Sequence, residues 1–425
     1  MVWVLAITPF VLLLFGFPIF LLLALTSAIV LLVFMNVPMT AMHQLMFGSV
    51  DKFALMAVPF FIFAGELMGR GGISKRIVNW VLSIFGGLRG SLPLTAVGTA
   101  EVMGAISGSS PATVAAVGRL LYPSLRAKGY DDEFTNGLLT SSGAIAIVIP
   151  PSIAMILYSA ATEVSVALLF LAGILPGLLM GLLMCLYIVF YAARKGIRES
   201  QGFQMKTFVR ASADGVLALG MPFIILGGIY AGWFAPTEAA GIACVYAIVV
   251  TRFVYRDISW QGLWSVCVKS MYLTAQILII VAGAGVFSWL LTVNGIPQAL
   301  VTSIQTVDVP PWVLLLFVNL LLLIAGALID PNSAILVLTP LLLPLVTAVG
   351  VDPVHFGIIM TVNLAIGMYT PPFGLNIFVA QALFRAPLST IYRGVVPFIL
   401  INLVSLAIVT YVPQLSLYMT RFAGY

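Results

Sequence analysis

Hydrophobic residues form long stretches along this chain, and short polar segments separate them. A membrane-crossing α-helix needs about 20 mostly apolar residues, so the pattern predicts a helical membrane protein. The N-terminus lacks a basic region and a cleavage site and is interpreted as the first span. Helices are expected near 1–35, with a division at Gly16-Phe17-Pro18, and near 53–69, 133–149, 152–194, with a division near Glu163, 214–232, 236–251, 270–292, 353–370, 373–384 and 394–412.

Two segments, 91–125 and 310–345, do not fit a simple crossing. Each is longer than one span and carries small, polar and proline residues near its middle, at 107–113 and 326–333. Such a centre is tolerated at membrane depth only where it is buried in protein or lines a polar cavity. We therefore expect two re-entrant helical hairpins whose tips meet near the middle of the membrane.

An internal repeat relates the two halves of the chain. The pairs Pro150-Pro151 and Pro371-Pro372 are 221 residues apart, and each interrupts an apolar helix. Paired broken helices are the sequence feature that points best to the binding site of a secondary transporter. The same offset matches Pro123 with Pro344, Gly129 with Gly350, Thr140 with Thr361, Ser142 with Asn363 and Ile156 with Ile377.

Composition agrees with a membrane protein. The chain is 62% hydrophobic and 8% charged, whereas soluble domains carry roughly 25% charged residues. Its net charge of +5 does not indicate nucleic-acid binding, because the basic residues are scattered among loops and do not share one face.

The basic residues predict the orientation, since cytoplasmic loops are enriched in Lys and Arg. Residues 126–130, after the first hairpin, are expected in the cytoplasm with the other basic loops. Four loops contain no Lys or Arg and are expected on the outside: 35–51, 158–165, 230–238 and 293–311. The first hairpin would then open to the cytoplasm and the second to the outside.

The predicted fold class is therefore an all-α polytopic membrane protein of two inverted repeats, each with a re-entrant hairpin and a broken transmembrane helix. Five parts follow from this organisation. They are 1–90, scaffold and arm helices of the first repeat; 91–165, the first hairpin and broken helix; 166–309, scaffold, spans of the second repeat and an arm helix; 310–388, the second hairpin and broken helix; and 389–425, a C-terminal span.

The hairpin tips and the proline breaks form the candidate chemical site. Na⁺ takes oxygen ligands, and in transporters these include backbone carbonyls at the ends of broken helices. Each tip is expected to face the broken helix of its own repeat, which gives two related cation sites. The first would use Ser107, Gly108, Ser109, Ser110, Thr113, Ser142, Gly143, Ile147 and Pro150. The second would use Asp330, Asn332, Ser333, Asn363, Gly367, Met368 and Pro371.

A structural alternative exists for both tips, because small and polar residues also let helices pack closely in lipid. Two such clusters at matching repeat positions, each paired with a double proline, favour a functional role.

Five acidic residues fall in or near apolar segments, where an ionised side chain costs roughly 2.5 kcal/mol or more. Asp330 stands alone at a hairpin tip and is the strongest candidate for a cation or substrate role. The other four have structural alternatives: pairing of Glu66 with Arg70, pairing of Glu101 with Arg119, capping of a helix by Glu238 and an interfacial position for Glu163.

The sequence contains no signal for an enzyme. It lacks the G-x-x-x-x-G-K-[ST] motif that binds ATP phosphates, and it has no metal-ligand spacing of His or Cys. Neither catalytic residues nor an organic cofactor are expected, and Na⁺ is the only metal ion predicted. The remaining candidates are expected in the core, in loops or at interfaces: Cys185, Cys244, Cys267, His43 and His355.

Taken together, these motifs resemble the large membrane subunit of tripartite ATP-independent periplasmic (TRAP) transporters. The resembling stretches run in order from about residue 50 to 385 and cover nearly the whole chain. They are Ala64-Gly65-Glu66-Leu67-Met68, Gly108-Ser109-Ser110-Pro111-Ala112-Thr113, Ile149-Pro150-Pro151-Ser152, Pro236-Thr237-Glu238-Ala239-Ala240, Asp330-Pro331-Asn332-Ser333 and Thr370-Pro371-Pro372.

The resemblance implies a Na⁺-coupled importer of elevator type in the bacterial inner membrane. A periplasmic binding protein would deliver the substrate, and a small four-helix membrane subunit would be a separate chain, because this chain has no room for it. Family substrates are mostly organic acids, including C4-dicarboxylates and sialic acid, and the chain looks nearest to the sialic-acid members. Helix N-termini and polar side chains would hold the anion, at Ser109, Ser110, Ser152, Asn332 and Thr370.

Two alternatives remain open from the sequence. A transporter of similar architecture could work alone, as a Na⁺:carboxylate symporter without a binding protein. A channel or a membrane receptor that does not transport belongs to a different class, and the paired broken helices argue against it.

Overall fold

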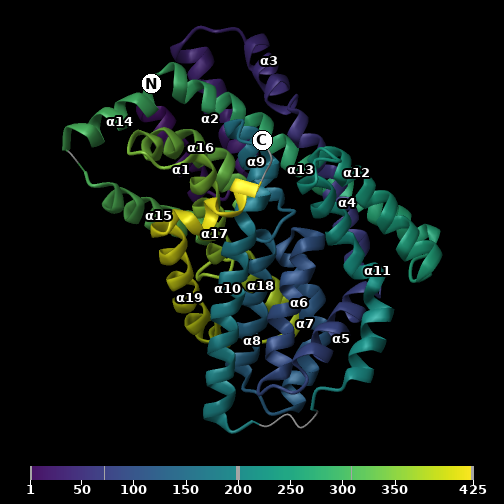
Figure 1. The fold of residues 1–425 in the computed structure, drawn as a ribbon. Coiled ribbons are helices and arrows are strands. Elements are labelled where there is room, and N and C mark those ends of the chain that lie inside the picture. Colours follow the sequence, from purple (N-terminus) through teal and green to yellow (C-terminus); the bar gives the residue numbers. More distant parts are fainter. Residues whose placement is uncertain (1, 71, 198–201, 308, 423–425) are drawn as a thin grey trace.

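The computed structural model describes residues 2–70, 72–197, 202–307 and 309–422. These residues fold into helices joined by short turns (Figure 1), which confirms the predicted all-α class. Eight of the described helices, or pairs of abutting helices, are long and apolar enough to cross a membrane: Phe53–Arg70, Val166–Lys195, Met205–Tyr230, Pro236–Val254, Trp260–Val293, Pro311–Leu328, Pro331–Ala348 and Leu388–Tyr411.

The N-terminal region begins with two short helices, α1 (Val2–Leu14) and α2 (Ile19–Ile29), which separate at the predicted Gly16-Phe17-Pro18 break. The other helices before the first hairpin are α3 (Met39–Val50), α4 (Ala57–Arg70) and α5 (Ile73–Phe85). Amphipathic α5 buries one apolar face, including Ile73 and Ile77, against its neighbours.

The first hairpin, hereafter hairpin 1, consists of α6 (Ser91–Ser107) and α7 (Ser110–Ala127), with its tip at Gly108-Ser109. The broken helix that follows comprises α8 (Asp132–Ser142), a 3₁₀ turn (Gly143–Ile147) and α9 (Ile153–Thr162). The interruption contains the double proline, whose Pro150-Pro151 bond is cis. Helix α10 (Val166–Lys195) begins after Glu163, as predicted.

The second half repeats this order. Hairpin 2 consists of α15 (Pro311–Leu328) and α16 (Pro331–Ala348), and the broken helix consists of α17 (Pro353–Gly367) and α18 (Leu375–Phe384). The Pro371-Pro372 bond between α17 and α18 is also cis. The remaining helices are α11 (Met205–Tyr230), α12 (Pro236–Ile248), α13 (Trp260–Val293), α14 (Ile296–Val307), α19 (Leu388–Tyr411) and α20 (Pro413–Leu417).

Helix α13 differs from the sequence-based expectation. The sequence predicts a span near 270–292 and a separate amphipathic arm helix within 166–309, which we expect near 258–270, but Trp260–Val293 form one continuous helix of 34 residues. No Pro interrupts this stretch, so the hydrogen-bonded ladder continues through it. In Figure 1 this helix runs diagonally across the upper part of the molecule and contacts α2, α3, α4 and α16.

Close backbone contacts join each hairpin to its own broken helix. A Cβ atom on Gly104 of α6 would lie 2.7 Å from Ala146 Cα, and one on Gly326 of α15 would lie 3.2 Å from Gly367 Cα. Ala146 and Gly367 are related by the 221-residue offset. Small residues at matching positions thus let the first arm of each hairpin approach its broken helix closely.

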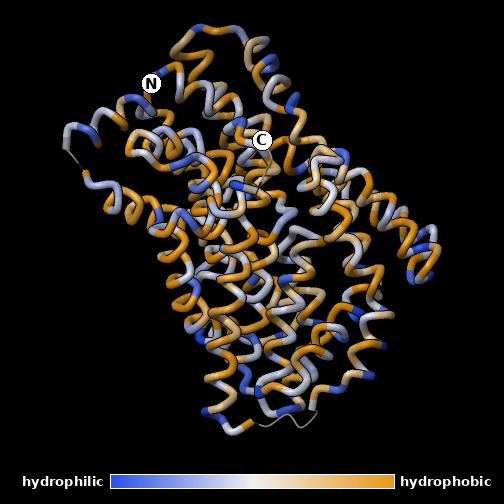
Figure 2. The backbone as a smooth tube through the Cα atoms, viewed as in Figure 1, coloured by the Kyte–Doolittle hydropathy of each residue, from blue (hydrophilic) through white to orange (hydrophobic). Residues whose placement is uncertain are grey.

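Loops that the sequence assigns to the same side do lie together. Lys195 Nζ at the end of α10 is 2.9 Å from Asp131 Oδ2 before α8, and Lys52 Nζ is 3.1 Å from Glu163 Oε1. Hydrogen bonds from Tyr191 and Lys195 hold the pKa of the Asp131 carboxyl below its usual value. Figure 2 shows hydrophobic residues along most helices and hydrophilic ones at the connecting turns. The orientation in the membrane remains a prediction.

Candidate functional site

Both hairpin tips and both helix breaks border one pocket of about 590 Å³. Helix α13 and the start of α2 form its other wall, with mainly apolar side chains. Tip residues far apart in sequence, such as Ser109 and Asn332, therefore line the same space. The two tips thus lie at one pocket, and their depth in the membrane stays a prediction.

Four helices begin at this pocket. Their first residues all line it: Ser110 of α7, Ile153 of α9, Pro331 of α16 and Leu375 of α18. The N-terminus of a helix presents unpaired N–H groups and the positive end of the helix dipole, which favour a bound anion. Among the described residues that line the pocket, none is Lys or Arg. Backbone N–H groups and polar side chains are thus the available anion-binding groups.

Helix C-termini also end at the pocket. Gly108 follows α6, Ile147 ends the 3₁₀ turn after α8, and Met368 follows α17. The carbonyl groups at such ends lack intrahelical donors. Carbonyl oxygens at broken helices are the ligands that transporters use for Na⁺. The pocket therefore offers groups for a cation beside groups for an anion.

The tip of hairpin 1 packs directly on the Pro150-Pro151 break of its own repeat. Gly108 has a φ of +55°, and a Cβ atom there would lie 2.5 Å from the Pro151 carbonyl oxygen. Thr113 Oγ1 donates to the Ser109 carbonyl at 2.9 Å and lies 3.3 Å from Ser107 Oγ. Several oxygens of the first predicted cation set are thus brought close together.

The remaining members of that set lie just behind the tip. A Cβ atom on Gly143 would lie 3.0 Å from the Ser110 carbonyl oxygen. Ser142 is buried and donates its hydroxyl hydrogen to the Leu139 carbonyl at 3.3 Å. Ile147 lines the pocket, whereas Pro150 lies within the break and does not.

At the tip of hairpin 2, between α15 and α16, Asp330 caps helix α16. Its Oδ2 accepts a hydrogen bond from Ser333 N at 3.1 Å, and its Oδ1 accepts one from Ser333 Oγ. The carboxylate is half-buried and also lines the pocket. Asp330 therefore has a structural role as the N-cap of α16. Binding of a cation by the same carboxylate stays a prediction.

Asn363 lies deeper than the tip. Its Nδ2 donates to Asn319 Oδ1 and to the Ile359 carbonyl, both at 2.8 Å. Its Oδ1 is buried without a hydrogen-bond partner among the described residues. Asn319 precedes Gly326 by two turns of α15, so the Asn363 amide is directed toward the arm of hairpin 2. Gly367 and Pro371, the remaining predicted ligands of this set, do not line the pocket, whereas Met368 does.

The five predicted anion-binding residues divide into two groups. Ser109, Ser110 and Asn332 line the pocket. Ser152 Oγ donates to the Ile147 carbonyl at 2.5 Å, and Thr370 Oγ1 donates to the Ile366 carbonyl at 2.8 Å. The latter two hydroxyls satisfy carbonyls of their own helix breaks and lie outside the pocket lining.

The other acidic residues have structural partners that the sequence predicted only in part. Glu238 Oε2 accepts a hydrogen bond from Ala235 N at 2.8 Å, which confirms the predicted helix cap. Glu66 forms the predicted ion pair with Arg70 at 4.0 Å and a closer one with Lys269 at 2.9 Å. Glu101 does not pair with Arg119, because Arg119 is exposed and Glu101 packs against Gly181 of α10. The predicted Glu101–Arg119 pair is therefore wrong. The three cysteines are free.

Sequence reasoning missed two polar residues. Among the described residues that line the pocket, Gln276 is the polar side chain that α13 contributes. Asn376 of α18 is fully buried and hydrogen-bonded to Ser110 at the tip of hairpin 1 and to the Thr140 carbonyl. An amide side chain within a mostly apolar stretch is the sequence signal that could have identified both.

Two helical hairpins and two broken helices around one pocket form the kind of site that secondary transporters use. The chain matches the family model of the tripartite ATP-independent periplasmic transporter, DctM component, over residues 6–415. It therefore belongs to this family of transporter permeases and is not an enzyme.

Relatives with different substrates match over nearly their whole length. The chain is 39% identical over 402 residues to the C4-dicarboxylate TRAP transporter large permease protein DctM of Pseudomonas aeruginosa, covering 95% of this chain and 94% of that protein. It is 35% identical over 383 residues to the sialic acid TRAP transporter large permease protein SiaM of Vibrio cholerae, covering 90% of each.

Among solved structures, the YdaH transporter of Alcanivorax borkumensis has a similar fold. The TM-score is 0.58 at 14% sequence identity, over 89% of this chain and 88% of that one. At this identity the similarity concerns the fold alone.

Proposed function

We propose that this chain is the large permease of a Na⁺-coupled importer for an organic acid in the bacterial inner membrane. A periplasmic binding protein delivers the substrate, and a small four-helix membrane subunit on a separate chain completes the complex. Hairpins 1 and 2 and the broken helices move as one unit against the other helices, in an elevator mechanism. The substrate is a carboxylate of the C4-dicarboxylate or sialic-acid class.

The observation that carries this proposal is the convergence of four helix N-termini on one pocket that lacks Lys and Arg among its described lining residues. Such a pocket suits a carboxylate held by N–H groups. Ser109 and Asn332 supply further hydrogen-bonding side chains at the two tips, whereas the Ser110 hydroxyl is buried and bonded to Asn376. The volume of about 590 Å³ suits a small molecule and excludes a macromolecule.

Na⁺ coupling is supported by the charge balance of the same pocket. Asp330 adds a carboxylate near the N-termini that would hold an anionic substrate. Two negative groups at close range repel each other, so a cation between them would favour binding of the substrate. The hard oxygen atoms at the helix ends suit Na⁺ in that position.

The partners are supported by family membership. The relatives from Pseudomonas aeruginosa and Vibrio cholerae are named large permease proteins of TRAP transporters, and the family model is described as a component of a tripartite periplasmic transporter. A large permease that works with two further components explains both descriptions. A stand-alone Na⁺:carboxylate symporter is the alternative.

Uptake into liposomes tests the proposal. The purified chain would be reconstituted with and without the small membrane subunit, and radiolabelled succinate or sialic acid would be offered with its binding protein. We expect uptake that requires both partners and an inward Na⁺ gradient. Equal uptake in choline buffer would refute the coupling to Na⁺. Na⁺-driven uptake by this chain alone would support the stand-alone symporter.

A further inference from the structure

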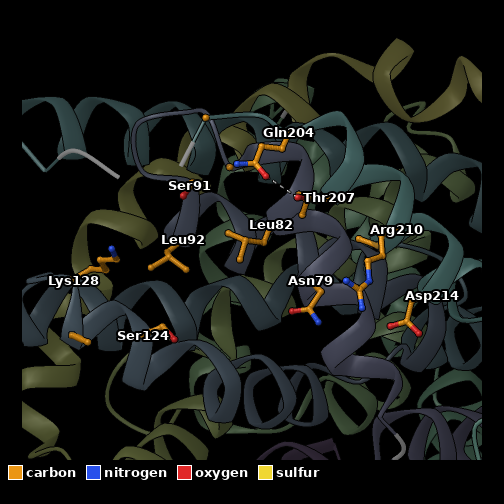
Figure 3. A pocket seen from close by; sticks show the side chains of 15 residues that line it. Asn79, Leu82, Ser91, Leu92, Ser124, Lys128, Gln204, Thr207, Arg210 and Asp214 are labelled. Atoms are coloured by element: carbon orange, nitrogen blue, oxygen red, sulfur yellow. Dashed lines mark hydrogen bonds between the residues drawn. The ribbon is translucent and has the colours of Figure 1, made fainter. Parts of the chain in front are cut away.

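A second pocket, of about 960 Å³, lies at the far end of hairpin 1 from its tip. Its walls are the start of α6, the end of α7, one face of α5 and the N-terminal half of α11 (Figure 3). Helix α6 has 17 residues, so at about 1.5 Å per residue it separates this pocket from the tip by about 25 Å. The second pocket is therefore distinct from the substrate site proposed above.

The charge of this pocket is positive. Lys128 after α7 and Arg210 of α11 line it from opposite sides (Figure 3). Neither forms an ion pair with any of the residues that the structure describes. Among the described lining residues Asp214 is the acidic one, and it lies 3.6 Å from Arg76, which also pairs with Asp257 at 2.8 Å. Lys128 and Arg210 against Asp214 leave the described lining with an excess of one positive charge, which favours an anion.

Neutral donors lie between the two cations. Asn79, Ser124 and Thr207 line the pocket with Gln204. Thr207 Oγ1 donates to Gln204 Oε1 at 3.1 Å, and this bond orients the Gln204 amide. An anion with several oxygens could accept hydrogen bonds from these groups while Lys128 and Arg210 neutralise it. Phosphate has that chemistry.

An apolar surface adjoins the polar one on the same helix. Met205, Val209 and Val216 of α11 are exposed, whereas Thr207 and Arg210 line the pocket. A ligand with an anionic head and an apolar tail matches both surfaces. The basic loops predict that this end of hairpin 1 faces the cytoplasm, where basic pockets between membrane helices bind anionic headgroups.

We propose that this pocket binds the phosphate headgroup of an anionic phospholipid, with the acyl chains along the exposed face of α11. The site joins α6 and α7 of hairpin 1 to α5 and α11. If the elevator mechanism proposed above holds, a lipid here would restrain the hairpin against these helices and slow transport. The binding of the lipid does not depend on that mechanism.

Native mass spectrometry of the purified full chain in detergent tests the binding. We expect retention of dioleoylphosphatidylglycerol over dioleoylphosphatidylcholine, and a roughly 20-fold weaker retention for the double variant Lys128→Gln/Arg210→Gln. The matched variant Lys75→Gln/Lys206→Gln removes the same charge from α5 and α11 outside the pocket and should bind like the unmodified protein. Equal loss in both double variants, or no loss in either, would overturn the proposal.

A labelling experiment places the lipid and distinguishes it from free phosphate. Ser124→Cys would report on the pocket and Lys206→Cys on the surface outside it, after replacement of the three native cysteines by serine. We expect phosphatidylglycerol to slow maleimide labelling at position 124 at least fivefold and not at 206, with no effect of phosphatidylcholine. Equal protection by millimolar inorganic phosphate would reject the lipid as ligand, and equal protection at both positions would reject the site.

Discussion

Asn376 Nδ2 lies 2.7 Å from Ser110 Oγ and so joins helix α18 of the second half to the tip of hairpin 1. The same amide group donates to the Thr140 carbonyl at 3.1 Å. The residue related to Asn376 by the 221-residue offset is Met155, which cannot form these bonds. The two halves are thus tied together by a polar contact that has no counterpart in the first half.

Replacement of Asn376 by alanine should destabilise the protein. Asn376 and Ser110 are both fully buried, and loss of the amide leaves polar groups without partners at a cost of roughly 1–3 kcal/mol. Thermal unfolding in detergent measures the effect. Asn332→Ala is the matched control, because Asn332 is only half-buried and lines the pocket. Equal unfolding temperatures for the two variants would contradict the prediction.

Substitutions of Asp330 separate its two roles. Asparagine can still accept the hydrogen bond from Ser333 N, so Asp330→Asn should unfold near the temperature of the unmodified protein, whereas Asp330→Ala should lose about 1 kcal/mol from the missing cap. Both variants should lose at least tenfold in Na⁺-driven uptake, because both remove the charge. If Asp330→Asn transports normally in liposomes, the carboxylate serves only as a cap.

The contact between α8 and α19 should not tolerate a larger residue. A Cβ atom on Gly137 would overlap the Gly394 carbonyl oxygen, so Gly137→Ala forces the helices apart. Gly227→Ala in α11 meets no atom within 4 Å, and alanine favours a helix interior by about 1 kcal/mol. The first variant should therefore lower the unfolding temperature and the second should keep or raise it. The opposite order would show that α8 and α19 do not pack in this way.

Cysteine labelling tests whether the tips move together. Ser109→Cys and Asn332→Cys line the same pocket from different hairpins. In a protein without native cysteines, both should become accessible to an impermeant thiol reagent from the periplasmic side under outward-favouring conditions, and both should be protected under inward-favouring ones. Permanent access to both would indicate a channel.

A rocking motion would also alternate this access, so a cross-link is needed as well. A disulfide between a hairpin and the surrounding helices should trap the tips at one depth and stop uptake, with recovery on reduction. Unchanged transport by the cross-linked protein would exclude the elevator.

The hydrophobic pattern alone predicted most of the helices, because membrane spans depend on local length and apolarity. The proline pairs and the small polar segments at 107–113 and 326–333 also identified the hairpins and the breaks. These features are local: a double proline removes two consecutive backbone N–H donors, whereas single prolines such as Pro176 in α10 and Pro222 in α11 stay within continuous helices. The continuous course of α13 was not predicted, since an amphipathic segment and an apolar one look like separate helices in sequence.

Contacts between distant segments were decided by the tertiary structure. Asn376 meets Ser110 across 266 residues, Asn363 turns toward Asn319, and Glu101 packs on Gly181 and does not reach Arg119. The hydroxyls of Ser152 and Thr370 bond to their own breaks and not to the pocket. Which of several buried polar groups become partners depends on helix packing and on the geometry of each hydrogen bond, and a linear sequence specifies neither directly.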